Sequence, residues 1–351
     1  MKMMNSFKAY WILWLREMLK TITNAYLNQK KEFYNPDFAN LTSIVDGSIN
    51  YPKRTTFLDE DTKNRLKLDV LNHYENACFI IEYNGIYSLI ANFDLKGNIK
   101  KHEFVIPDVV QGMVLNYQHY NAEAAPISVL TGSRVDFESI LNSIDYDNLV
   151  HYDQAKVYVF KDDKAESILD KVDMNQEYYL ADGHHRYLAS QHIINKQGCL
   201  AMISNLDDVR IDAINRKMQL VESFQDSIDY LDQEGFVRVQ GPLRKGLVEI
   251  QHQGKSYFYE FQNMENDIFG NHDIYRLHTQ IISQGFKQYD SMSLTYSSSE
   301  MTLNDNEVAF NTWPMSKEEF QMYADKDIIL PPKSTSFEPK CPSLFVIALI
   351  Q

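Results

Sequence analysis

The sequence predicts an α+β fold built on a mixed sheet, and three observations support this. The apolar pattern is helical up to about residue 70 and then changes to the short runs typical of strands. Two of these runs, residues 78–83 and 86–91, flank Asn84-Gly85, a strong hairpin signal because a type I′ turn requires positive φ at both positions. Beyond the hairpin, apolar runs of strand length alternate with helical stretches.

Residues 1–70 are predicted to form a mostly helical N-terminal extension. Its apolar run, residues 9–15, is too short to cross a bilayer, and no small-residue cleavage site follows, so no transmembrane segment is expected. We interpret this run as an amphipathic helix with Trp11 and Trp14 on its apolar face. We expect the helix to pack on the body of the protein. A membrane-surface contact or a homodimer contact is the alternative.

Residues 71–220 are predicted to form the core, and residues 221–351 an α+β C-terminal part. After the first hairpin, the core should contain strands at residues 126–130, 157–160, 178–181 and 200–203 and helices around residues 108–120, 135–143, 164–171 and 184–196. In the C-terminal part, Gln253-Gly254 predicts a second hairpin. A core-facing helix is expected over residues 274–282, a capping box from Ser316 to Glu319, and a buried strand over residues 344–350.

The composition is that of an ordinary globular protein, with 351 residues, 44% hydrophobic and 23% charged. The 34 Lys and Arg against 48 Asp and Glu give a net charge of −14, which argues against a general nucleic-acid binder, since such a protein needs a basic face. The three cysteines are far apart and form no CxxC pair. That pattern favours a reducing compartment, so the cytoplasm is the expected location.

The segment Asp182-Gly-His-His-Arg-Tyr187 is the most unusual of the chain. An apolar strand is predicted to run into Gly183, where the chain turns sharply, and a helix to begin at His184. The first turn of a helix presents amides and a positive dipole end, and Arg186 adds a planar fork suited to phosphate. The sequence therefore predicts a phosphate site here. The alternative is an ordinary helix start with a solvated Arg186 and two incidental histidines.

Two further segments are candidates for the same chemistry. Lys101-His-Glu103 follows a predicted strand, and the Glu103 carboxylate is suited to act as general base for an alcohol. The alternative is a solvated charged loop. Pro331-Pro-Lys-Ser-Thr335 offers the Lys333 ammonium and the Ser334 and Thr335 hydroxyls to phosphate, or is merely a turn before the last strand.

Other frameworks are disfavoured. The chain contains no Walker GxxxxGK[ST], no Rossmann GxGxxG and no GxSxG. Zinc is a weak interpretation, because His184 and His185 are adjacent on a predicted helix and point in different directions. If a metal takes part, Mg²⁺ held by Asp182 and by the phosphates of a nucleotide is the better expectation.

Together the segments Lys101-His-Glu103, Pro126-Ile127, Asp182-Gly-His-His-Arg-Tyr187 and Pro331-Pro-Lys-Ser-Thr335 resemble a widespread bacterial family of unknown function. The first three also resemble the ParB/sulfiredoxin superfamily, which includes free-serine kinases with HE and DGxHR motifs. The chain is most similar to the kinases: His184 stands where sulfiredoxin needs its Cys nucleophile, and no helix-turn-helix of the ParB type is evident.

The resemblance implies a ParB/sulfiredoxin-like core and a nucleotide-dependent kinase that uses ATP or ADP with Mg²⁺ on free L-serine or a similar hydroxyl metabolite. It implies that Glu103 is the catalytic base, with His102 in support. Asp182, His184, His185 and Arg186, with Gly183 and Tyr187, would then form the nucleotide-phosphate region. The alternatives are a nucleotide-binding regulatory protein without turnover, and a nucleotidase or phosphatase using the same anion site.

Overall fold

The computed structural model describes residues 18–29, 43–45, 48–50, 61, 64, 70–174, 176–264, 267–340 and 342–350. The chain divides into two units. The first comprises residues 1–101, 105–209 and 339–351, and the second comprises residues 102–104 and 210–338. The chain therefore contributes residues 102–104 to the second unit and then returns to the first. The rest of the second unit begins at residue 210. The predicted three-part division, with boundaries at 70 and 220, stays a prediction.

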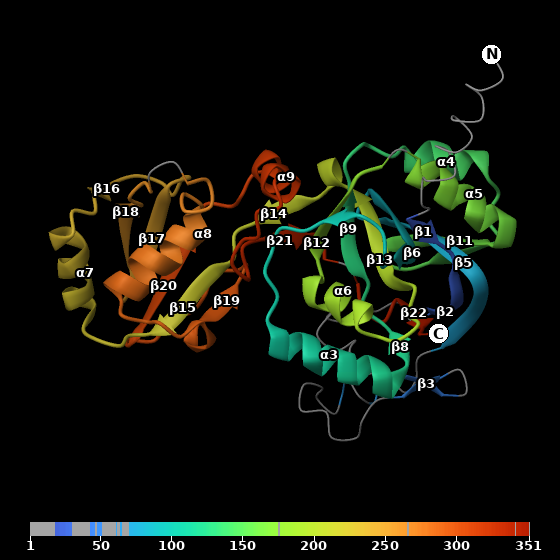
Figure 1. The fold of residues 1–351 in the computed structure, drawn as a ribbon, viewed down its shortest axis with the longest axis horizontal. Helices are drawn as coiled ribbons and strands as arrows, with labels where there is room; N and C mark the ends of the chain where they lie inside the picture. The colour runs from blue at the N-terminus through green and yellow to red at the C-terminus, as the bar shows by residue number, and fades with distance from the viewer. Residues whose placement is uncertain are drawn as a thin grey trace, which may run out of the picture. The chain divides into compact units, whose positions relative to one another are not determined.

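The first unit is built on a mixed sheet, and the prediction of an α+β fold is confirmed (Figure 1). Its main strand order is β7-β12-β9-β13-β6-β5-β2-β22-β8, in which β7 with β12 and β9 with β13 are parallel and the other neighbours antiparallel. The strands are β1 Leu19–Lys20, β2 Ile22–Asn28, β5 Leu71–Tyr83, β6 Ile86–Asp94, β7 Ile99–Lys100, β8 Ala122–Glu123, β9 Ile127–Thr131, β10 Asn148–His151, β11 Ala155–Lys161, β12 Tyr178–Asp182, β13 Gly198–Asn205 and β22 Val346–Leu349.

The central hairpin forms where the sequence predicts it. β5 and β6 are joined by Asn84 and Gly85, whose φ angles of 50° and 76° are both positive, as the turn requires. Along β5 the side chains alternate between two cores. Cys78 and Ile80 pack on one face of the sheet, whereas Phe79 and Ile81 pack on the other. Because both faces are covered, β5 is apolar without interruption from residue 77 to residue 81 rather than alternating with polar residues.

Helices cover the first of these faces, and two more pack together beside Ile350 at the chain's end. The helices of this unit are α3 Pro107–Tyr120, α4 Phe137–Ser143, α5 Asp162–Asp173, α6 His184–Gln191 and the short 3₁₀ helix η2 Leu206–Asp208. Side chains of α4 and α5 enter the core on the Cys78 side. α3 and α6 lie side by side (Figure 1) and share a small apolar cluster of their own. The four α-helices lie within about two residues of their predicted starts, and α6 ends earlier than predicted.

The N-terminal part differs from its prediction. Residues expected to be helical form β1 and β2, and β2 lies between β5 and β22 in the sheet. Residues 43–45 and 48–50 also form a strand pair, β3 Ser43–Val45 and β4 Ser48–Asn50. Pairing with strands far along the chain overrides the local helical pattern here. The helix predicted around Trp11 and Trp14 lies outside the described residues.

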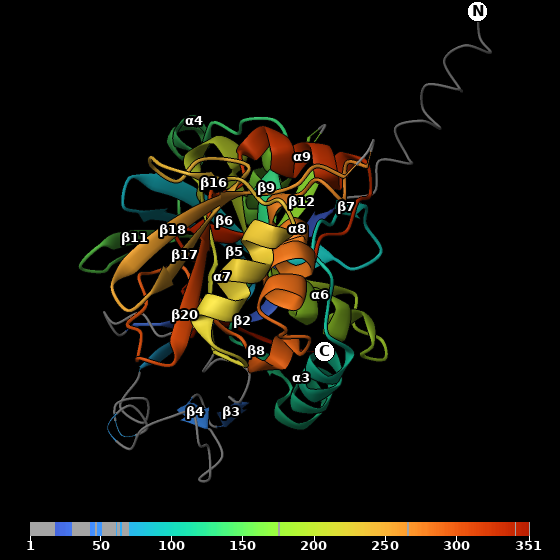
Figure 2. The same cartoon turned by 90° about the vertical axis from the view of Figure 1, so that its left-hand side faces the viewer.

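The second unit is also α+β, with a six-stranded antiparallel sheet in the order β16-β18-β17-β20-β15-β19. Its elements are β14 Arg210–Asp212, β15 Asn215–Gln219, α7 Phe224–Gln233, β16 Arg238–Val239, β17 Leu247–His252, β18 Lys255–Glu260, α8 Asp273–Arg276, η3 Leu277–Gly285, η4 Ser291–Ser293, β19 Thr295–Ser297, β20 Glu307–Thr312, α9 Lys317–Asp325 and β21 Ser336–Glu338. β14 and β21 form a separate pair. α7 and the helix beginning with α8 lie on one face of the six-stranded sheet (Figure 2).

Local signals predict several elements of this unit correctly. The hairpin at Gln253-Gly254 joins β17 and β18, and the predicted stripe of residues 274–282 lies on α8 and η3, which continues α8 with π geometry. α9 begins with a complete capping box, in which the Ser316 hydroxyl accepts from Glu319 N at 3.2 Å and the Glu319 carboxylate accepts from Ser316 N at 3.1 Å.

Candidate functional site

The predicted strand-to-helix turn is present in the first unit. β12 ends at Asp182, Gly183 has φ 85°, and α6 begins at His184. A Cβ at Gly183 would lie 2.9 Å from Ile127 Cγ2 and 2.9 Å from Arg186 Nη2, closer than real Cβ atoms come. Glycine is therefore required both by the backbone conformation and by the closeness of Arg186.

Substitution of Gly183 tests this requirement. Gly183→Ala forces an L side chain into the left-handed region and against Ile127 Cγ2 in a well-packed core. We expect the free energy of unfolding to fall by about 2–4 kcal/mol, measured by urea denaturation. Gly112→Ala, in the middle of α3 where a Cβ meets nothing within 4 Å, is the control and should be neutral or stabilising. Equal stability of the two variants would show that the turn is not strained.

Asp182 is held ionised by positive charges. Its Oδ1 accepts a hydrogen bond from Gly183 N at 2.8 Å, and its Oδ2 lies 3.9 Å from Arg186 Nη2 and 3.9 Å from Lys340 Nζ. Burial acts to raise the pKa of Asp182, but the charges of Arg186 and Lys340 and the Gly183 hydrogen bond outweigh it, so this pKa lies below its ordinary value. With two cations against one carboxylate, the cluster carries a net positive charge.

Arg186 and the two histidines of the turn have different surroundings. Arg186 is buried, and its Nε has no hydrogen-bond partner among the described residues. His184 is buried as well. His185 Nε2 accepts from Ile106 N at 2.9 Å, at the residue that precedes α3. This hydrogen bond anchors the start of α3.

Tyr187, the last residue of the motif, is in contact with Lys101. Tyr187 is buried in the main core, and Lys101 Nζ lies 5.0 Å from the centre of its ring. Burial lowers the pKa of Lys101. Tyr187 therefore packs rather than presents its ring to a ligand.

In the second unit, Glu103 lies against the Pro-Pro-Lys-Ser-Thr segment. Residues 102–104 and Leu330 are joined by two backbone hydrogen bonds, Leu330 N to His102 O at 2.7 Å and Phe104 N to Leu330 O at 2.9 Å. Ser334 N then donates to Glu103 Oε2 at 3.3 Å. These two candidate segments, far apart in sequence, are thus brought together, and the half-buried carboxylate of Glu103 has one oxygen fixed.

His102 secures the same loop from the inside. It is fully buried, its Nε2 lies 2.9 Å from Thr335 Oγ1, and its ring packs edge-on against Phe320. Ser334 Oγ donates to Pro331 O at 2.7 Å, and Thr335 is buried. Both hydroxyls are therefore used within the loop. The Lys333 side chain is exposed, on a residue with a positive φ of 62°.

Arg216 is a further member of this cluster that the sequence analysis missed. It is completely buried on β15, where its Nη2 donates to Lys333 O at 2.6 Å and its Nη1 donates to Ile214 O. Burial lowers the pKa of Arg216 to about 10, although the charges of Tyr296 and Glu103 act to raise it. The sequence indicates this burial by the spacing of Arg216 and Met218. Residues two positions apart in a strand point to the same face, and here that face is buried.

Removing Arg216 should destabilise the second unit. Arg216→Met removes the donor of a buried hydrogen bond to Ile214 O and of a half-buried one to Lys333 O, and a buried group left unsatisfied costs about 1–3 kcal/mol. We expect the free energy of unfolding to fall by about 2–4 kcal/mol, measured by urea denaturation. The control is Arg210→Gln, at an exposed residue that forms an ion pair with Asp212. This substitution should change the free energy of unfolding by less than about 1 kcal/mol. A stable Arg216→Met protein would mean that these bonds do not hold the loop.

The residues around Asp182 do not fit a resident divalent cation. Asp182 is the one carboxylate of the motif, and Arg186 and Lys340 stand on its Oδ2 side, where they would repel a metal ion. Among the residues that the structure describes, no three His, Cys, Asp or Glu side chains gather as a metal site needs. Mg²⁺ bound by Asp182 is therefore disfavoured, and the geometry favours an anion.

The predicted site residues are distributed over both units. Asp182, Gly183, His184, His185, Arg186 and Tyr187 belong to the first unit, with Lys340 added by the structure. Glu103, His102, Lys333, Ser334 and Thr335 belong to the second, with Arg216 added. Within each unit the residues form one connected cluster.

Comparison with known proteins gives a family but no function. A family model described as "Protein of unknown function (DUF1015)" matches residues 82–330, which confirms the resemblance to a family of unknown function. The curated proteins contain no match to this chain. No helix in the described part of the chain is long and apolar enough to cross a membrane.

Several solved structures are similar to this chain. One is SbnI with a C-terminal truncation, from Staphylococcus aureus, with 13% identity and a TM-score of 0.46 over 73% of this chain and 86% of that one. A mutant free serine kinase in complex with AMP has 12% identity and a TM-score of 0.44 over 74% and 91%. A conserved hypothetical protein from Pyrococcus furiosus has 13% identity and a TM-score of 0.40 over 72% and 93%.

Proposed function

The chain belongs to the DUF1015 family of proteins of unknown function, and from its own residues we propose that it is a nucleotide-dependent kinase that phosphorylates the hydroxyl of a small metabolite. Free L-serine is the acceptor we propose first, because the HE and DGHHR segments resemble those of free-serine kinases. A reaction of this kind requires little covalent chemistry of the protein. It requires positioned phosphate groups, neutralised charge and a base for the alcohol.

The observation that carries the proposal is the cationic turn at Asp182–Arg186. Arg186 is buried with Nε uncommitted in the described part of the chain, at the first turn of α6, where helix amides and the dipole favour an anion. Lys340 adds a second charge at Asp182. In a chain with a net charge of −14, such a local positive cluster supports binding of nucleotide phosphates.

Glu103 supports the assignment of a base. Its Oε2 is fixed by Ser334 N, and His102 and Arg216 hold the loop that supplies this amide. A carboxylate whose orientation is fixed by buried neighbours is suited to accept a proton from an alcohol that attacks a phosphoryl group. In this proposal Glu103 takes the proton from the acceptor hydroxyl, and the hydroxyl oxygen forms the new bond to phosphorus as the bond to the leaving nucleotide breaks.

Phosphorus NMR tests the proposal directly. The purified full chain is incubated with Mg²⁺, ATP or ADP and L-serine, and phosphoserine is the expected product. Turnover with another hydroxyl amino acid would retain the kinase and replace the acceptor. Thermal stabilisation by nucleotide with no product over hours would favour the regulatory binder, and free phosphate released without an acceptor would favour a nucleotidase. No effect of any nucleotide would overturn the proposal.

Arg186 should carry much of the nucleotide affinity. Arg186→Lys keeps the charge beside Asp182 but loses the planar fork that binds two phosphate oxygens at once. We expect nucleotide binding to weaken by about 10- to 100-fold, the equivalent of one or two charge-assisted hydrogen bonds. Isothermal titration with ADP measures this. Arg134→Lys, an exposed residue of the same unit paired with Asp208, is the control and should bind as the wild type does.

A further inference from the structure

The second unit contains a cavity of about 690 Å³ that the kinase proposal does not use. Its floor is polar and is formed by α8, the segment before it and the end of β20. Its apolar lining includes Ile268, Trp313, Met315 and Met322. A volume of this size and a mostly apolar wall with a few grouped polar side chains are typical of sites for small organic molecules.

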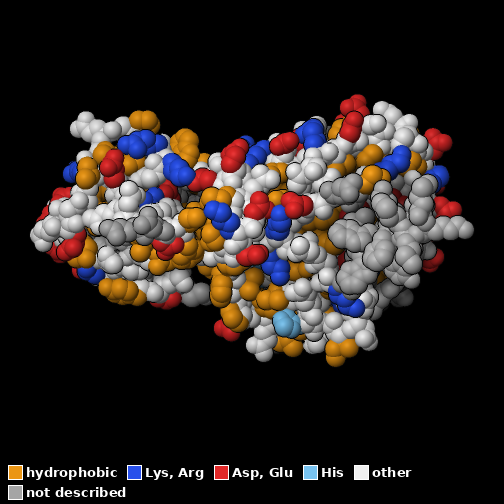
Figure 3. Space-filling model, turned by 45° about the horizontal axis from the view of Figure 1, so that its top comes forward, with side chains coloured by type: hydrophobic (Ala, Val, Ile, Leu, Met, Phe, Trp, Pro, Cys, Tyr) orange, Lys and Arg blue, Asp and Glu red, His pale blue; other side chains and the backbone are white. Residues whose placement is uncertain are grey.

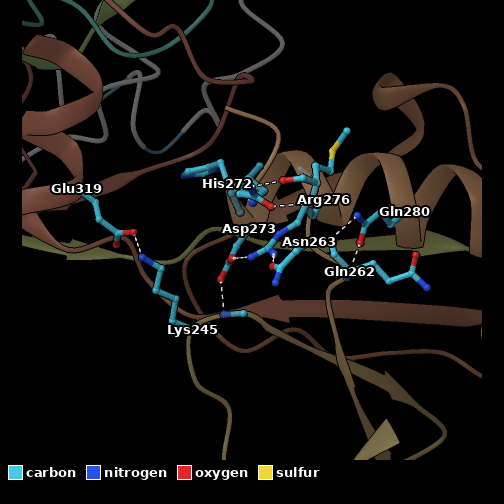
Figure 4. Close-up of polar contacts among 12 residues, drawn as sticks. Lys245, Gln262, Asn263, His272, Asp273, Arg276, Gln280 and Glu319 are labelled. Carbon is cyan, nitrogen blue, oxygen red and sulfur yellow. Dashed lines mark hydrogen bonds and ion pairs between the residues drawn. The ribbon is translucent and has the colours of Figure 1, made fainter. Parts of the chain in front are cut away.

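Two of the three carboxylates that line this cavity, those of Asp273 and Glu319, are engaged through both oxygens. Asp273 accepts from Arg276 Nη2 at 2.6 Å through one oxygen and from Gly246 N at 2.9 Å through the other (Figure 4). Glu319 accepts from Ser316 N through Oε2 and from Lys245 through Oε1 (Figure 4). Asp267, the third, is exposed and accepts from Phe269 N at 3.0 Å through Oδ1. Asp273 and Glu319 therefore offer little to a cationic ligand.

Most of the polar groups that remain in the cavity can donate hydrogen bonds. Asn263 uses its Oδ1 to accept from Arg276 Nη1 at 3.0 Å, which leaves both protons of its Nδ2 (Figure 4). Arg276 Nε and Thr312 Oγ1 are buried, and neither has a hydrogen-bond partner among the residues that the structure describes. Both residues line the cavity and are more than nine-tenths buried, so their unmet groups need a partner close by.

His272 adds one more donor to the same floor. Its Nδ1 accepts from Ile274 N at 3.2 Å, so in the neutral ring the proton is on Nε2. Burial, followed by the positive charges of Arg216, Arg276 and Lys245, lowers the pKa of His272 to about 3, and the ring is neutral at physiological pH. Two of these three cations, Arg276 and Lys245, line the cavity together with His272.

From this excess of donors over acceptors we infer that the cavity binds a small organic anion, with its carboxylate or phosphate on Asn263, Arg276 and Lys245 and its apolar body against Trp313. Lys245 is bound to Glu319 by one of its three protons and retains two for a ligand. Trp313 is 49% exposed, so part of its ring is available to cover a ligand. The cavity shares Ser334 with the loop that holds Glu103, but the residues proposed here to bind the anion belong neither to that loop nor to the turn at Asp182.

Four probes with the same benzyl body and different head groups test the inference. Phenylacetate carries a carboxylate, benzyl phosphate a phosphate, benzyl alcohol a neutral hydroxyl and benzylamine a cation. Dissociation constants are measured on the full chain by ligand-observed NMR titration. We expect at least one of the two anions to bind about 10-fold or more tightly than the alcohol and the amine, since hydrogen bonds to charged groups are roughly twice as strong as neutral ones. Which anion binds better identifies the head group.

Two variants place the binding in this cavity. Asn263→Asp keeps the acceptor for Arg276 and replaces the amide donors by negative charge, and should weaken anion binding at least about 10-fold. Lys245→Gln, at an exposed position, should weaken it by a smaller factor. Lys255→Gln on β18 is the matched control and should not change it. Thermal denaturation confirms that each variant is folded.

The inference is overturned if the amine or the alcohol binds as tightly as the anions, if no probe binds, or if Asn263→Asp binds the anions as the wild type does. The last outcome would assign any anion binding to another part of the chain. The turn at Asp182 is the obvious alternative for benzyl phosphate, and Arg186→Lys distinguishes it, since that variant should leave binding to the cavity unchanged.

Discussion

Replacing Glu103 by Gln is expected to lower turnover by at least about 100-fold and to leave nucleotide affinity unchanged, because loss of a general base costs about 100- to 10,000-fold. Gln keeps an oxygen that accepts the hydrogen bond from Ser334 N, so the loop should stay in place. What the substitution removes is the ability to take a proton from the acceptor alcohol. The effect should therefore appear in kcat and not in the affinity for nucleotide.

The measurement pairs turnover with binding. Product formation is followed by phosphorus NMR with the acceptor that the wild type uses, and nucleotide affinity by isothermal titration. Glu300→Gln, an exposed carboxylate of the second unit, is the control and should retain full activity. If Glu103→Gln turned over at the wild-type rate, Glu103 would lose the role of base. If it failed to bind nucleotide, its role would be structural.

The sequence predicts what local chemistry determines. Asn84-Gly85 specifies a turn by the φ angles it permits, and Ser316 with Glu319 specifies a helix start by two reciprocal hydrogen bonds, and both are found. The turn at Gly183 is of the same kind, since strand, glycine and helix are neighbours in the chain. Such features need no information from distant residues, which is why a single sequence reveals them.

Contacts between distant segments could not be predicted in this way. Glu103 and Ser334 were both candidates, but nothing in either segment predicts that they share a hydrogen bond. Arg216 has no motif around it, because its role comes from the carbonyl groups that the folded chain brings to it. The strands β1 and β2 are wrongly expected to be helical for the same reason: their partners β5, β6 and β22 lie far along the chain.

The stability of the second unit should depend strongly on pH because two of its histidines are held neutral. Burial, and then nearby cations, lowers the pKa of His272 to about 3 and that of His278 to about 4, from 6.5. Below pH 6.5 the unfolded chain binds a proton at each ring that the folded chain does not bind. The free energy of unfolding therefore has its full value above pH 6.5 and decreases as the pH falls toward 4 and 3.

His272→Asn separates this effect from the carboxylates that also titrate in acid. Asn accepts a hydrogen bond from Ile274 N as His272 does, and it is among the best N-cap residues, so the start of α8 is preserved. It does not titrate. At pH 4.5, two pH units below the ordinary pKa, His272 alone should cost the wild type about 2–3 kcal/mol that the variant keeps.

Urea denaturation of wild type and His272→Asn at pH 7.5, 6.5, 5.5 and 4.5 measures this difference. Each pH unit corresponds to about 1.4 kcal/mol per proton, so steps of about one unit resolve the effect. The two free energies of unfolding should lie close together at pH 7.5 and diverge in favour of the variant as the pH falls. His151→Asn, an exposed histidine of the first unit, should keep the wild-type dependence. Parallel curves for wild type and His272→Asn would show that His272 takes up its proton in the folded chain.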